Sequence, residues 1–286
     1  MTINLHLFKH ITINLHPSAV IHPSAVIHPS AKIHKSVEVN AYTIIGADVK
    51  IDEGTIVESH AVIQGSTKIG KNNHIYSFAF IGGDPQDVTY EEGQESNLII
   101  GDDNIIREFC TINRGTEKEN SLTRIGSNNM LMSHVHIAHD CQLGDHIIMS
   151  NNASLAGHVI VQDWAILGGF SLVKQFCRIG AHTHTGMGCH INKDIPPYMV
   201  AKCSGGRVRV GMQGYTHNPW SRNYAAVKRA FFAVYVHNHG KLIDQTLTEL
   251  EDSEAGSYEV MQFVKFIRMS KCGIIMRGCS SSYEYI

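Results

Sequence analysis

The stretch LHPSAVIHPSAVIHPSAKIHKSVE, residues 15–38, places an aliphatic residue at every sixth position. The same step continues from Leu15 to Ile81 without meeting a residue of another kind, and the residue four places later is mostly small or β-branched. A helix would show a period near 3.6 and a simple strand a period of 2. A period of six with two inward positions predicts a parallel β-helix, in which each hexapeptide forms one short strand and one corner.

The six-residue period is interrupted twice, at residues 84–98 and 117–123, and it ends near Ile191. Three hexapeptides close one triangular coil, so residues 1–200 are predicted to form about nine coils. Neighbouring coils should lie roughly 4.8 Å apart, the spacing of paired strands. Each coil buries its aliphatic residues against the next, so no single repeat is stable alone. The spacing leaves the handedness open.

A second, smaller domain is predicted after the repeats. The period stops at Pro196-Pro197, and proline suits the end of a hydrogen-bonded ladder because it lacks an N–H. Residues 201–286 are predicted to contain a linker, which includes the glycine- and arginine-rich stretch SGGRVRVGMQG, and then a helical domain. The apolar spacing predicts three helices, namely Ser221 to Gly240 with a stripe of Ala225, Val227, Phe231, Phe232, Val234 and Tyr235, then Gln245–Glu251, then Glu259–Met269.

The composition indicates a soluble globular chain in the cytoplasm. Apolar residues make up 43% and charged residues 17%, with a formal net charge of −2, which argues against a nucleic-acid-binding protein. No apolar run reaches the roughly 18 residues of a membrane span, and the N-terminus does not resemble a signal peptide. The seven cysteines include no close pair, so we expect reduced thiols that mostly fill small apolar spaces.

The chain contains 19 histidines, and they fall into two groups. His16, His22, His28 and His34 occupy equivalent corners of the first repeats and are predicted to be solvated surface residues. The second group lies in residues 134–158. Zinc is one reading of His134, His136 and His139, but their spacing matches no zinc motif and no cysteine pair completes a site, so we expect no metal.

The coil arithmetic gathers candidate catalytic groups at one corner, and solvated surface histidines are the alternative interpretation of the same pattern. One coil spans 18 residues, so His139, Gly157 and Gln175 are predicted to lie in one column. His158 follows Gly157 directly. A histidine is suited to general base work near neutral pH, and Asp140, the next residue, is placed to select its tautomer. The N–H of Gly157, which no side chain covers, is a candidate oxyanion donor.

Several longer strings carry a family resemblance. They are TINRGT (111–116), HIAHDC (136–141), NNASLAGHV (151–159), QFCRIGAH (175–182) and DIPPY (194–198). From about residue 15 to about residue 277, the chain resembles the UDP-N-acetylglucosamine acyltransferases of lipid A biosynthesis. The resemblance implies a mainly β fold, a left-handed parallel β-helix with a small C-terminal helical domain, assembled as a homotrimer. It also implies transfer of a 3-hydroxyacyl group from acyl carrier protein to the sugar 3-position, with the thioester as a substrate and no cofactor.

The resemblance also assigns roles to individual residues. It makes His139 the general base, Asp140 its orienting partner and Gly157 the oxyanion donor. His136, His158, Asp87 and Gln175 resemble the family's sugar and phosphate contacts, and Gln213 is placed to bind uracil. In the family, the loop that carries Asp87 reaches across the trimer interface.

Four departures from the family pattern bear on the substrate. Thr89 stands where the family usually has a lysine, Lys174 stands where it commonly has a histidine, and the nucleotide-binding segment at 210–221 reads VGMQGYTHNPWS. Met187 stands where long-chain members have glycine, which predicts a medium acyl chain. Weak activity, a modified acceptor sugar and a specialised paralogue are all compatible with these changes. The alternatives are another hexapeptide acyltransferase, acting from acetyl-CoA on a nucleotide amino sugar, or a non-catalytic β-helix protein.

Overall fold

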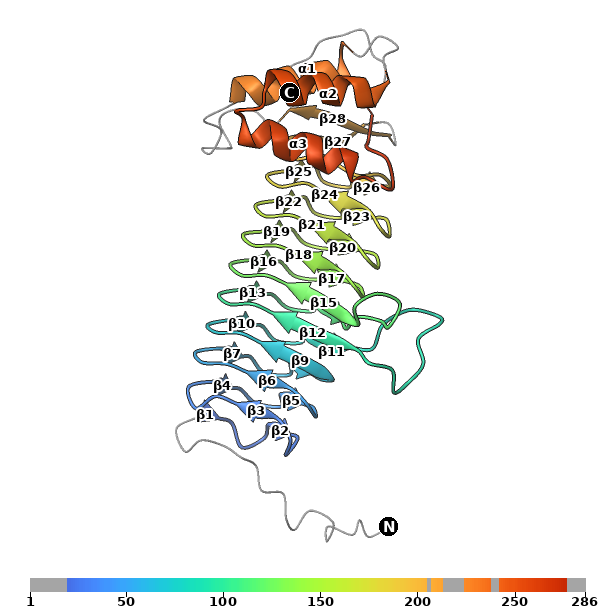
Figure 1. The fold of residues 1–286 in the computed structure, drawn as a ribbon. Helices are drawn as coiled ribbons and strands as arrows, with labels where there is room; N and C mark the ends of the chain where they lie inside the picture. Colours follow the sequence, from blue (N-terminus) through green and yellow to red (C-terminus); the bar gives the residue numbers. More distant parts are fainter. Residues whose placement is uncertain (1–19, 205–206, 213–223, 238–241, 277–286) are drawn as a thin grey trace.

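The computed structural model describes residues 20–204, 207–212, 224–237 and 242–276. The chain forms an elongated stack of coils with three helices at one end (Figure 1). Some of the predictions fall outside the described residues, namely those on the repeats before Val20, on Gln213, on His217 and Asn218, on the Ser221 and Gly240 helix boundaries, and on Cys279.

Short strands from successive coils pair into three sheets, and all the pairs are parallel except β27 with β28. The first sheet contains β1 (Val20–Ile21), β4 (Glu38–Val39), β7 (Ile56–Val57), β10 (His74–Ile75), β13 (Ile105–Ile106), β16 (Met130–Leu131), β19 (Ile148–Met149), β22 (Ile166–Leu167), β25 (His184–Thr185), β27 (Met199–Ser204) and β28 (Arg207–Met212). The second contains β2 (Val26–Ile27), β5 (Ile44–Ile45), β8 (Val62–Ile63), β11 (Phe80–Gly83), β14 (Thr111–Asn113), β17 (His136–Ile137), β20 (Ser154–Leu155), β23 (Leu172–Val173) and β26 (His190–Ile191). The third contains β3 (Lys32–Ile33), β6 (Lys50–Ile51), β9 (Ser66–Ile69), β12 (Asn97–Ile100), β15 (Leu122–Ile125), β18 (Gln142–Leu143), β21 (Ile160–Val161) and β24 (Arg178–Ile179).

The predicted β-helix is confirmed, and its core is the aliphatic column that the repeats define. Ile45 pairs with Ile63 and Ile137 with Leu155, and all four side chains are almost fully buried. The filler role predicted for cysteine is confirmed for Cys110, Cys141 and Cys189, and Cys177 is likewise wholly buried at an inward position. Most corners place one residue in the left-handed region, Asp140 and His158 among them.

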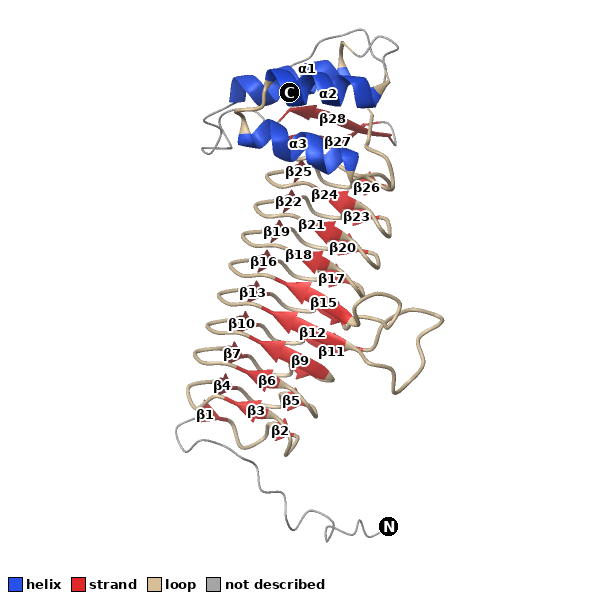
Figure 2. Cartoon of the chain, viewed as in Figure 1, coloured by secondary structure: helices blue, strands red, loops and turns tan. Residues whose placement is uncertain are grey.

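The two interruptions are shorter than the sequence predicts. Residues 97 and 98 begin β12, and residues 122 and 123 begin β15. Both segments extend the third sheet, because Asn97 pairs with Ser66 on one side and with Leu122 on the other. The boundaries 84–98 and 117–123 were therefore wrong at their C-terminal ends. In Figure 2 both loops project from the same corner of the stack.

The predicted linker after residue 200 is instead a hairpin, because β27 continues the first sheet beside β25 and then pairs with β28 antiparallel. Three helices follow, α1 (Tyr224–Tyr235), α2 (Ile243–Ser253) and α3 (Tyr258–Arg268), which overlap the three predicted ranges. In α1 the predicted stripe needs correction: Ala226 and Ala230 are buried, whereas Ala225 is exposed and Phe232 half-buried. Among the described helices, none is both long and apolar enough to cross a bilayer.

Candidate active site

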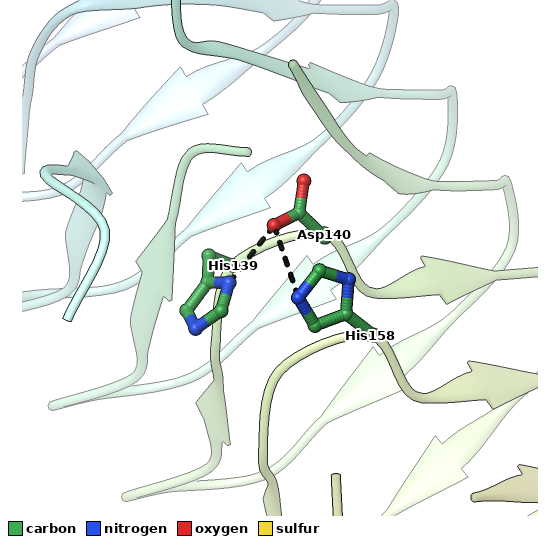
Figure 3. A group of neighbouring side chains, drawn as sticks. All are labelled: His139, Asp140 and His158. Atoms are coloured by element: carbon green, nitrogen blue, oxygen red, sulfur yellow. Dashed lines mark hydrogen bonds and ion pairs between the residues drawn. The ribbon is translucent and has the colours of Figure 1, made fainter. Parts of the chain in front are cut away.

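Two histidines converge on one carboxylate at the corner between the second and third sheets (Figure 3). His139 and Asp140 follow β17, and His158 follows β20 one coil further on. His139 Nδ1 lies 2.9 Å from Asp140 Oδ2, and His158 Nε2 lies 3.6 Å from the same oxygen. The two rings meet edge to face with centroids 5.1 Å apart. All three residues are buried in the single chain, His139 with 5% of its surface exposed.

Asp140 is held by a residue that sequence reasoning missed. Thr116 donates to both carboxylate oxygens, from its backbone N–H at 2.8 Å and from its hydroxyl at 2.7 Å. Burial by itself would raise the pKa of Asp140, but the hydrogen bonds from His139 and Thr116 outweigh it and hold that pKa below its usual value. Asp140 is therefore an anion at neutral pH.

This anion selects the tautomer of His139. An ionised carboxylate can only accept, so the ring nitrogen facing it, Nδ1, carries the proton. The other nitrogen, Nε2, is then left with a free lone pair. A neutral imidazole oriented in this way can take a proton from a bound hydroxyl, so the geometry matches the predicted general base.

Gly157 lies against the His139 ring. A Cβ at Gly157 would lie 2.5 Å from His139 Cε1 and 2.7 Å from Nε2, so any larger residue would displace the imidazole. Among the described residues, the Gly157 N–H finds no hydrogen-bond acceptor. A backbone donor beside the base is the arrangement that an oxyanion site needs.

His136 and His158 complete the histidine cluster. Thr111 Oγ1 lies 2.7 Å from His136 Nδ1, and burial together with the neighbouring His139 lowers the pKa of His136. The His158 ring stacks on Phe176 of the next coil at 4.6 Å. The zinc reading fails for this trio because His134 is exposed and stacks on Phe109 at a different corner.

A second connection joins this cluster to Asp87. Lys118 Nζ lies 2.7 Å from Asp87 Oδ2, and Asp87 Oδ1 accepts from the Thr89 N–H and hydroxyl, each at 2.9 Å. The hydrogen bond from Lys118, reinforced by those from Thr89, lowers the pKa of Asp87 well below its usual range. In the same short loop, Glu119 lies 3.6 Å from His158. Residues 116–119 therefore link the loop of Asp87 to the His139–Asp140 pair.

The loop that carries Asp87 is anchored below the site. Arg114, itself buried, donates to the Gly82 carbonyl and to the Asp84 carboxylate, and Asn113 donates to the Asp84 carbonyl at 2.5 Å. Both anchors belong to the TINRGT string, which the sequence singled out only as a family signature. They fix the point where the chain leaves the β-helix.

The remaining predicted residues, Gln175 and Met187, lie at the surface of the chain. Gln175 is exposed at the corner of the following coil, next to the exposed Lys174. Met187 is 81% exposed, so it does not fill the β-helix core. The structure thus gathers His139, Asp140, Gly157, His158 and His136, joins Asp87 to them through Lys118, and leaves Gln175 and Met187 at the surface.

Several known proteins are similar to this chain in both sequence and fold. No family model matches the chain. Two curated relatives are acyl-[acyl-carrier-protein]–UDP-N-acetylglucosamine O-acyltransferases: that of Tolumonas auensis is 45% identical over 82% of this chain and 89% of its own length, and that of Syntrophobacter fumaroxidans is 41% identical over 83% and 92%. The UDP-N-acetylglucosamine acyltransferase of Francisella novicida superposes with a TM-score of 0.86 at 35% identity, over 93% of this chain and all of that one. The fold of these neighbours is the left-handed β-helix.

Proposed function

Because this chain belongs to the acyl-[acyl-carrier-protein]–UDP-N-acetylglucosamine O-acyltransferases, we propose that it transfers a 3-hydroxyacyl group from acyl carrier protein to the 3-hydroxyl of UDP-N-acetylglucosamine. This reaction is the first step of lipid A biosynthesis. The observation that carries the proposal is the buried His139–Asp140 pair, which Thr116 holds and which packs against Gly157, a glycine whose N–H has no acceptor among the described residues.

The proposed transfer takes place in two stages. His139 Nε2 takes the proton from the sugar hydroxyl while that oxygen attacks the thioester carbonyl carbon. The negative charge moves to the carbonyl oxygen, where the Gly157 N–H stabilises it. The tetrahedral intermediate then collapses, the carbon–sulfur bond breaks, and the proton on His139 passes to the departing phosphopantetheine sulfur. The products are the acylated sugar nucleotide and free carrier protein, and the thioester is the acyl source, with no cofactor.

The surrounding polar groups fit a sugar nucleotide. Asp87, oriented by Lys118 and Thr89, offers an acceptor for sugar hydroxyls. His136, His158 and Gln175 supply further polar contacts along the same corner, and Gln213 is proposed to contact uracil. Thr89 stands where the family usually has a lysine, and Lys118 places a cation beside Asp87 in its stead.

The assay that tests this proposal offers the purified protein two donors, a hydroxyacyl carrier protein and acetyl-CoA, with a panel of UDP sugars. We expect turnover only with the carrier protein thioester, and fastest with UDP-N-acetylglucosamine. Acetyl transfer instead would identify a different hexapeptide acyltransferase. The absence of turnover with every pair would identify a non-catalytic protein.

We further propose that the protein is a cytoplasmic homotrimer with its sites between subunits. Exposed aromatic residues support this assembly, because Tyr42, Phe78 and Phe109 stack with His60 and His134 along one corner of several coils. An apolar stripe of this length is typical of an interaction surface. Sedimentation equilibrium should give three times the chain mass of 31.7 kDa. A fully active monomer would contradict the proposal.

Met187 is predicted to limit the length of the acyl chain. Its thioether stands exposed at a corner of a late coil in the single chain. In the proposed trimer, a partner subunit that closes a groove over this corner would confine the thioether, and overpacking such a groove with a longer acyl chain costs roughly 1–3 kcal/mol. That cost corresponds to about 5- to 150-fold discrimination. We expect the wild type to prefer chains nearer about ten carbons than about fourteen, and Met187→Gly to shift the preference upward. Rates with donors of graded length decide it, and an unchanged length profile would refute the role.

Lys118 is predicted to position Asp87 for the acceptor. Lys118→Met keeps the apolar stem but removes the cation, so KM for the UDP sugar should rise roughly five- to tenfold with a smaller change in kcat. Lys71→Met, which removes a comparable exposed ion pair with Glu53 on an early coil, is the matched control and should leave both constants unchanged. Equal effects of the two substitutions would rule out a specific role for Lys118.

A further inference from the structure

A second cluster of ligand-type side chains lies at the end of the β-helix, away from the histidine corner. Cys177 occupies the inward position just before β24, Asp194 opens the DIPPY string, and Cys272 follows α3. Their two sulfur atoms and one carboxylate oxygen all lie within 4.8 Å of one another. The cluster thus joins the last coil to a segment that is distant from it in the sequence.

Hydrogen bonds hold the three residues in place. Asp194 Oδ1 accepts from the Arg178 N–H at 2.8 Å, and Oδ2 accepts from the Ser270 hydroxyl at 2.7 Å. The backbone of Asp194 also exchanges hydrogen bonds with the segment around Cys272, from its own N–H to Gly273 and from Ile275 to its carbonyl, both at 2.9 Å. The Cys272 thiol donates to the Phe176 carbonyl at 3.3 Å. The segments that carry Cys177 and Cys272 are therefore both held by hydrogen bonds to Asp194.

The charge balance of the cluster favours a cation. Asp194 is wholly buried, and no described side chain pairs with it as a cation. Arg178, whose backbone N–H binds the carboxylate, turns its guanidinium to the Phe266 carbonyl at 3.4 Å and over the Phe266 ring at 4.4 Å. A buried carboxylate is costly without a positive partner, and two thiols beside it can supply soft ligands to such a partner.

We infer that Cys177, Asp194 and Cys272 form a zinc site, completed by a water molecule, which clasps the segment after α3 to the last coil. Two sulfur ligands and one carboxylate oxygen suit tetrahedral Zn²⁺, with bonds of about 2.0–2.3 Å. Those bonds require ligand atoms roughly 3.3–3.8 Å apart. Since the ligand atoms lie within 4.8 Å of one another, the cluster must contract by up to about 1.5 Å when the ion binds. Cys272 is only half-buried, which leaves a path for the ion and the water.

Protons balance in the binding step. Without metal, burial raises the pKa of Cys177 to about 12, so its thiol is protonated at neutral pH. Zn²⁺ displaces one proton from each thiol, both protons pass to solvent, and the two thiolates and the carboxylate share the ion. A disulfide between Cys177 and Cys272 is the competing chemistry. It forms only when a two-electron oxidant takes up the electrons of the two thiols, and the reducing conditions of the test below exclude such an oxidant.

The test uses the full-length protein, reduced, equilibrated with Zn²⁺ and dialysed, followed by metal analysis. We compare the wild type with Cys272→Ser, with Cys177→Ala, whose alanine matches the inward Ala153 and Ala165, and with Cys203→Ser, which removes an exposed thiol outside the cluster. Wild type and Cys203→Ser should each retain one more zinc per chain than the other two variants. Co²⁺ in the wild type should show sulfur-to-metal absorption in the near ultraviolet that Cys272→Ser lacks.

Zinc should also raise the Tm of the wild type and of Cys203→Ser, and leave that of Cys272→Ser unchanged, because the ion ties two segments of the folded state only. Equal zinc content in all four proteins would overturn the proposal. So would a Cys177–Cys272 disulfide that persists in the reduced, zinc-equilibrated wild type. The test does not depend on acyl transfer, so its outcome is separate from that of the proposed function.

Discussion

His139→Ala should lower kcat by about 10²–10⁴-fold, the usual cost of losing a general base. The side chain is buried, but its ring faces Asp140 and Gly157 at a corner and takes no part in the aliphatic column inside the β-helix. We therefore expect Tm to stay close to that of the wild type. Steady-state kinetics with hydroxyacyl carrier protein and UDP-N-acetylglucosamine, run beside a thermal melt, measures both quantities.

The matched control for this substitution is His22→Ala. His22 lies on a corner of the first described coil, where, among the described residues, its ring forms hydrogen bonds to Ser24 alone, at 2.8 Å from the hydroxyl. The substitution His22→Ala should leave kcat unchanged. An unaltered kcat in His139→Ala would remove the residue from the mechanism, and a large fall in Tm with a proportionate loss of active protein would make it a structural histidine.

Asp140→Asn should lower kcat by about 10³–10⁴-fold, as removal of the orienting carboxylate does in a comparable His–Asp pair. The amide can donate to His139 Nδ1, which would move the ring proton to Nε2 and leave no base facing the substrate. It would also lose one of the acceptor oxygens that Thr116 uses. Because Asp140 has a φ of 61° and asparagine tolerates that region, the backbone should not change.

Asp48→Asn is the control for that substitution, since Asp48 occupies an equivalent left-handed corner with φ 59° in an early coil, far from the histidines. It should retain the wild-type rate. If Asp140→Asn also retained it, the tautomer of His139 would not depend on Asp140, and the role assigned to the pair would be wrong.

The regular part of the fold could be predicted because the sequence is periodic. Ile45 and Ile63 lie one coil apart in the chain and pair directly in the structure, and the same arithmetic places His139 beside Gly157. Asp140 follows from its place next to His139. Wherever the chain keeps the six-residue period, the spacing of two residues in the sequence determines their relative positions in the β-helix.

Where the chain leaves the period, this relation fails. Thr116 ends the TINRGT string and Lys118 lies in the second interruption that follows it, and nothing in their spacing indicates that one reaches Asp140 and the other Asp87. The hairpin after residue 198 was missed for a related reason, since its glycines and arginines are typical of loops until the edge of the first sheet offers them a partner. Cys272 meets Cys177 only through the tertiary docking of α3.

The measurement that tests the account most directly is the chemical identity of the product formed from hydroxyacyl carrier protein and UDP-N-acetylglucosamine. Mass spectrometry should find one hydroxyacyl group on the sugar nucleotide, fragmentation should place it on the 3-oxygen, and mild alkali should release it as an ester. Under initial-rate conditions, His139→Ala should form at least about 10²-fold less of this product per unit time than the wild type. An alkali-stable amide, an acetylated sugar made only from acetyl-CoA, or an ester formed equally well by His139→Ala would contradict the account.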